Sequence, residues 1–143
     1  MKKFLSIGTE LVEVEFTEQD FKEDYFKHIP DVDPTYLIRY DEEKDIAILD
    51  KNAPQWYKEL AALHETICCG GKYEDLVPGL TSVAPEERCS RIERFVLLNA
   101  GENRQAYILA RIDMFRMLLD KKLCDDKFRP NIKHTLDMLI LNL

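Results

Sequence analysis

The sequence lacks an excess of basic residues and any long apolar run. Lysine and arginine number 20 against 27 aspartates and glutamates, which gives a formal net charge of −7. An acidic surface disfavours DNA and RNA, because basic patches bind the nucleic-acid backbone. No apolar run approaches the length that crosses a bilayer. We therefore expect neither a nucleic-acid partner nor membrane association.

Several common site motifs are also missing. The four cysteines contain no C-x-x-C pair, so neither a zinc ribbon nor a thioredoxin-like site is predicted. Gly70-Gly71 lacks the following lysine and serine or threonine of a phosphate-binding loop, and there is no G-x-S-x-G motif of a serine hydrolase. The first residues become polar too soon for a signal peptide, which favours the cytoplasm and reduced thiols.

The pattern that is present predicts an α+β fold, mainly helical, with a small antiparallel sheet in the N-terminal half. Apolar residues alternate with glutamates in residues 11–16, as in a half-buried strand. Residues 36–50 predict a β-hairpin with a tip of about four residues. Helices are predicted for a short segment ending near residue 27 and for residues 54–69, 85–98, 102–123 and 130–143. The size of the chain and the absence of a linker predict a single domain over residues 1–143.

The most informative stretch is the predicted helix that ends at Gly70-Gly71, where glycine supplies the left-handed conformation of a C-cap. Pro54 suits the first helical position, and Asn52 is the expected N-cap. His64 and Cys68 are four residues apart, so they stand on one face of this helix, one turn from each other. This is the spacing of the two histidines in the zinc motif His-Glu-x-x-His.

A second pair, Cys89 and Glu93, has the same spacing on the next predicted helix. Two antiparallel helices would bring imidazole, thiolate and carboxylate groups together, and zinc accepts all three. The sequence therefore predicts a zinc site with His64, Cys68, Glu93 and Cys89 as ligands. The alternative is a helix-face histidine bonded to a carboxylate, beside a core thiol. A nucleophilic pair of His64 with Cys69 or Cys89 is a further alternative, but no local motif supports it.

A strand hairpin, a helix with His64-Glu65-x-x, and a later helix with an acidic residue follow one another in residues 36–98. This order resembles the small zincin-type metallopeptidases, including the ImmA/IrrE-like group. The resemblance implies His64 as a metal ligand and Glu65 as the catalytic base. It also implies a third ligand from one of three glutamates, of which the last is favoured because it shares a helix face with Cys89: Glu86, Glu87 or Glu93.

The chain departs from the zincin motif at Cys68, which stands at the position of the second histidine. Thiolate donates more charge to the metal than imidazole does, which weakens the metal's ability to acidify water and polarise a carbonyl. The prediction is a zincin-like domain that binds metal, with weak or lost hydrolase activity.

The alternative function is a small acidic protein-interaction module without catalysis, such as a phage or host-regulatory binding protein. The C-terminal residues 139–143 read Leu-Ile-Leu-Asn-Leu. This apolar segment either docks on the core of its own chain or forms a contact with another protein or a second copy. A protein partner or self-association through the C-terminal helix is therefore expected under this alternative.

Overall fold

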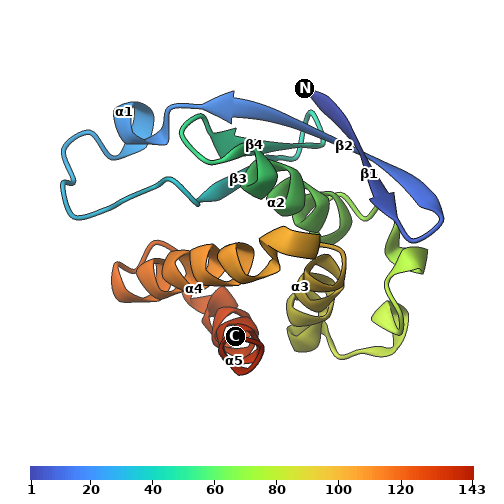
Figure 1. Ribbon diagram of the computed structural model, residues 1–143. Helices are drawn as coiled ribbons and strands as arrows, with labels where there is room; N and C mark the ends of the chain where they lie inside the picture. Colours follow the sequence, from blue (N-terminus) through green and yellow to red (C-terminus); the bar gives the residue numbers. More distant parts are fainter. The chain divides into compact units, whose positions relative to one another are not determined.

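The computed structural model describes residues 1–143, which form two compact units, Met1–Tyr73 and Glu74–Leu143 (Figure 1). The first unit contains a four-stranded sheet and two helices, and the second is helical. The predicted α+β, mainly helical fold with its sheet in the N-terminal half is confirmed. None of the helices combines the length and the hydrophobicity needed to span a bilayer. The single domain expected for residues 1–143 stays a prediction.

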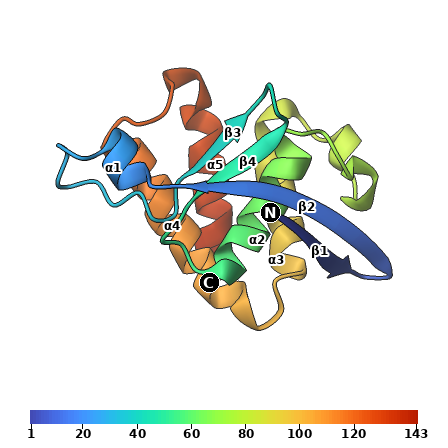
Figure 2. The same ribbon diagram turned by 90° about the horizontal axis from the view of Figure 1, so that it is seen from above.

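The sheet of the first unit has the strand order β1-β2-β4-β3. β1 (Lys2–Ile7) and β2 (Glu10–Gln19) are antiparallel, as are β3 (Ile38–Asp41) and β4 (Ile46–Asp50), which confirms the predicted hairpin. β2 pairs in parallel with β4 through residues 16–19, so β1 and β4 use consecutive halves of β2 (Figure 2). The sheet is therefore mixed and not wholly antiparallel, because the chain enters at β3 on the far edge and turns back beside β2.

α1 (Phe21–Tyr25) follows β2 directly and ends slightly before its predicted end. Its N-cap is Asp20, whose carboxylate accepts the backbone N–H of Glu23 at 3.1 Å. The buried Asp50 at the end of β4 accepts the backbone N–H of Phe21 at 2.9 Å. Two carboxylates thus satisfy N–H groups that the first turn of a helix leaves without an intrahelical partner.

Asp20 is expected to titrate below 3.8, the ordinary value for aspartate. The backbone hydrogen bond from Glu23 is the largest cause of its lowered pKa, followed by the side-chain hydrogen bond from Lys51. A lowered pKa means that the carboxylate stabilises the fold at neutral pH and that this contribution is lost as the pH falls through the folded-state pKa. An NMR titration of the carboxyl group tests this, and Lys51→Ala should reverse the shift only in part. A midpoint at or above 3.8 in the wild-type protein would contradict the prediction.

α2 (Gln55–Cys68) packs on the sheet of its unit through contacts with β2 and β4 (Figure 1). Pro54 occupies the N-cap position and no side chain caps the helix, so the predicted cap by Asn52 is wrong. Asn52 instead donates its backbone N–H to Asp50 at 3.1 Å. The buried side of α2 is mostly apolar and includes Tyr57, Leu60, Ala61, Ala62, Leu63 and Ile67.

The C-terminal end of α2 requires glycine, as predicted. A Cβ atom on Gly70 would lie 2.5 Å from the carbonyl oxygen of Thr66, a distance that real side chains do not reach. Gly71 has φ 66°, in the left-handed region where glycine is favoured. The helix therefore ends at Cys68, with Cys69 as its C-cap.

The second unit contains three helices, α3 (Arg88–Leu98), α4 (Arg104–Asp120) and α5 (Arg129–Leu141). They confirm the three C-terminal helices predicted from the apolar stripes. α5 packs against both α3 and α4. Short 3-10 turns connect or precede the helices: η1 (Glu74–Leu76), η2 (Leu80–Ser82), η3 (Pro85–Glu87), η4 (Gly101–Asn103) and η5 (Asp126–Phe128).

The apolar C-terminal segment is divided between the interior and the surface. Leu139 is fully buried, whereas Leu141 is 86% exposed and Leu143 is 55% exposed. Leu139 therefore belongs to the buried side of α5, and the exposed apolar side chains of this segment are Ile140, Leu141 and Leu143. That they contact another protein or a second copy of the chain stays a prediction.

Candidate metal centre

His64 and Cys68 provide a nitrogen and a sulfur donor on one face of α2. Their ligand atoms lie within 4.8 Å of each other. The imidazole is buried and the thiol is half-buried. Two donors one helical turn apart, one buried and one half-buried, suit the chelation of one ion.

The positions of these two side chains depend on the rigidity of α2. The helix is fixed to β2 and β4 by its buried apolar residues, and it is not interrupted between Gln55 and Cys68. A site on a packed helix is held more precisely than one on a loop. The donors therefore need little rearrangement to bind an ion.

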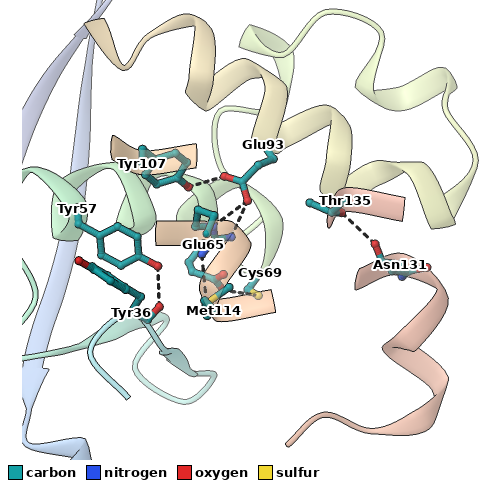
Figure 3. Close-up of polar contacts among 10 residues, drawn as sticks. Tyr36, Tyr57, Glu65, Cys69, Glu93, Tyr107, Met114, Asn131 and Thr135 are labelled. Atoms are coloured by element: carbon teal, nitrogen blue, oxygen red, sulfur yellow. Dashed lines mark hydrogen bonds and ion pairs between the residues drawn. The ribbon is translucent and has the colours of Figure 1, made fainter. Parts of the chain in front are cut away.

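Glu65 and Cys69 form a second pair on the neighbouring face of α2 (Figure 3). The Cys69 thiol donates to Oε2 of Glu65 at 3.0 Å, and Cys69 is exposed. Glu65, the predicted base, is turned about a quarter of the helix circumference away from His64. One of its two carboxylate oxygens accepts the hydrogen bond from Cys69, and the other would be available to act as a base toward a bound metal's water.

Cys89 lies on α3 in the second unit and is half-buried. That Cys89 joins His64 and Cys68 as a ligand of the same ion stays a prediction from the sequence. Zinc is bound by cysteine and histidine both in structural sites with four protein ligands and in catalytic sites with three ligands and a water. The chemistry of this donor set fits zinc.

Glu93, the predicted carboxylate ligand, is completely buried in an ion pair of the second unit (Figure 3). Nε and Nη2 of Arg111 donate to its Oε2 at 2.9 and 2.7 Å, and the hydroxyl of Tyr107 donates to its Oε1. Both carboxylate oxygens thus already accept hydrogen bonds from α4. Glu86 and Glu87, the less favoured candidates, are exposed on η3.

The sequence interpretation missed Arg111, the charged partner of Glu93. Its guanidinium carbon lies 5.7 Å from the ring centroid of Tyr107 and 4.9 Å from that of Phe115, in addition to the ion pair. One signal was available, since Arg111 is the only charged residue of the otherwise apolar stretch from Ile108 to Ile112 in the helix predicted for residues 102–123. A lone cation at such a position needs a buried anion as its partner.

No model of a known protein family, no curated protein and no solved structure matches the chain. The resemblance to the zincin-type metallopeptidases stays a prediction that depends on His64-Glu65 and the order of the elements. The chemistry of His64 and Cys68 therefore indicates what this site can bind.

Proposed function

We propose that the protein binds a zinc ion through His64 and Cys68 of α2, that Cys89 of α3 supplies a further thiolate, and that hydrolase activity at this ion is weak or lost. The observation that supports the proposal is the His64–Cys68 pair, whose donor atoms lie within 4.8 Å of each other on one helix face. The protein would then be a zincin-like domain that retains its metal.

The donor types favour zinc over magnesium and calcium. Thiolate and imidazole suit zinc, whereas magnesium and calcium prefer oxygen ligands. None of the four cysteines forms a disulfide, so the thiols can lose their protons to a metal. A reducing compartment such as the cytoplasm, which we propose as the location, keeps them in that state.

The same donors argue against strong hydrolytic activity. Two thiolates and a neutral imidazole would cancel the formal charge of a zinc dication, so a water on that ion would be less acidic than one on an ion held by three imidazoles. The carboxylate of Glu65, the predicted base, accepts a hydrogen bond from the thiol of Cys69. Metal binding without efficient water activation is therefore the function we propose.

Protein purified without chelator is expected to contain about one zinc ion per chain, measured by elemental analysis. Removing a ligand by His64→Ala, Cys68→Ser or Cys89→Ser should weaken zinc binding by at least about a hundredfold, since loss of even a supporting residue costs tenfold to a hundredfold. Replacement of zinc by cobalt tests the ligands directly. The sulfur-to-cobalt absorption should weaken when Cys68 or Cys89 is changed to serine.

The matched control is Cys69→Ser, which removes the adjacent exposed thiol from the same helix. This variant and Glu65→Gln should bind zinc as the wild type does. Wild-type protein without zinc affinity, or equal affinity in the His64, Cys68 and Cys69 variants, would disprove the proposal. If Cys89→Ser binds zinc as the wild type does while His64→Ala and Cys68→Ser do not, His64 and Cys68 are ligands and Cys89 is not.

A further inference from the structure

A cavity of about 230 Å³ lies in the second unit, and none of the proposed metal ligands lines it. It is smaller than the cavities of about 300–1,000 Å³ that hold drug-sized ligands, so it suits a small ion with its bound water. The side chains that line it are mostly basic or hydroxyl-bearing: Glu87, Ser90, Arg91, Arg94 and His134.

Two helices bring these side chains together. The residues at positions 87, 90, 91 and 94 recur at the i, i+3, i+4 and i+7 spacing that places them on one helical face. His134 comes from α5, which packs against both α3 and η3. The cavity is thus built by secondary structure and does not depend on a loop alone.

The basic side chains of this cavity have no acidic partner. Arg91 and Arg94 are neighbours on α3, and like charges at this spacing repel each other. Neither forms an ion pair, because the ion pairs of the second unit join Arg88 to Glu74 and Arg111 to Glu93. Two guanidinium groups thus line one cavity without a counter-ion from the protein, and this arrangement favours a bound anion.

Arg91 is held in place by the backbone of the preceding loop. Its Nη1 donates to the carbonyl oxygen of Pro78 at 3.1 Å, which leaves its other N–H groups for a ligand. Gly79 has φ 73°, and a Cβ atom there would lie 2.8 Å from the same Nη1. Glycine at position 79 therefore makes room for the guanidinium beside the cavity.

Ser90 supplies a hydroxyl-bearing side chain to the lining of the cavity. It is buried, and its hydroxyl donates to the carbonyl oxygen of Glu87 at 3.0 Å.

We propose that this cavity binds a small phosphate-bearing anion, with Arg91 and Arg94 as the charged donors and His134 as a third donor from α5. The planar fork of N–H groups in arginine matches phosphate oxygens two at a time, and a phosphoryl group near neutral pH carries enough charge to neutralise both guanidinium groups. Glu87 opposes the anion and limits its affinity. The proposal does not depend on the zinc site.

Calorimetric titration of the full chain with inorganic phosphate and pyrophosphate, at constant ionic strength, tests the proposal. Saturable binding is expected, tighter for pyrophosphate because it carries more charge. The double variant Arg91→Gln/Arg94→Gln should weaken binding at least about tenfold, since hydrogen bonds to charged groups are lost. Glu87→Gln should strengthen binding, because it removes the one acidic side chain of the cavity.

Arg116→Gln on the exposed side of α4 is the matched control, since it removes one positive charge far along the chain from the cavity residues. It should leave the affinity unchanged. Absence of saturable binding to the wild type overturns the proposal, and so does equal affinity of the double variant and the wild type. If the double variant fails to fold, the exposed Arg94→Gln alone makes the same comparison.

Discussion

Replacement of Arg111 by methionine is expected to lower the free energy of unfolding by about 3–5 kcal/mol, the usual cost of removing one partner of a buried ion pair. Arg111 is 2% exposed and its partner Glu93 is fully buried. Methionine replaces much of the apolar stem, so the main loss is the charge. The Glu93 carboxylate then stays buried with the hydroxyl of Tyr107 as its remaining partner among these three groups.

Urea unfolding followed by circular dichroism measures this effect. Arg116→Met is the matched control, because Arg116 is an exposed arginine on the same helix, and it should change the free energy by no more than about 0.5 kcal/mol. The double variant Glu93→Leu/Arg111→Met should recover part of the loss, since an apolar pair leaves no buried charge. Equal free energies of unfolding for Arg111→Met and Arg116→Met would show that the ion pair contributes little to stability.

One substitution distinguishes two roles for Glu93, that of ion-pair partner of Arg111 and that of metal ligand. Glu93→Gln removes the carboxylate charge and should destabilise the second unit through Arg111, while zinc affinity stays unchanged if His64, Cys68 and Cys89 are the ligands. A loss of zinc without a loss of stability would instead restore Glu93 as a metal ligand.

Replacement of Phe16 by alanine is expected to lower the free energy of unfolding by about 3–5 kcal/mol, because it leaves a cavity in the core of the first unit. Phe16 has no exposed surface. It is the first residue of β2 that pairs with β4, opposite Ala47. Its ring therefore fills the core at the place where β2 passes from its pairing with β1 to its pairing with β4.

Phe4→Ala on the adjacent strand β1 is the control for loss of the same ring, since Phe4 is 61% exposed. Its effect should stay within about 0.5 kcal/mol. Thermal and urea unfolding of both variants give the comparison. Equal losses in the free energy of unfolding for Phe16→Ala and Phe4→Ala would contradict the burial of Phe16 in the core.

The sequence by itself determined the elements whose causes are local. The β3–β4 hairpin follows from two short apolar runs around a charged tip, and α2 follows from its apolar period and from Gly70-Gly71 at its end. The placement of His64 and Cys68 on one face needs only the helical repeat. These features depend on residues a few positions apart, where the geometry of the backbone leaves few choices.

Only the tertiary structure decided the features that join distant residues. The sequence pattern does not show that β2 pairs in parallel with β4, because either strand direction satisfies the same alternation of apolar side chains. The sequence pattern predicted Glu93 as a metal ligand, whereas in the fold its carboxylate forms an ion pair with Arg111 of α4. The cavity of Arg91, Arg94 and His134 exists only because α5 returns to α3. In each case the partner is chosen by packing between elements, since burial of a charge or a strand edge requires a complementary group from elsewhere in the chain.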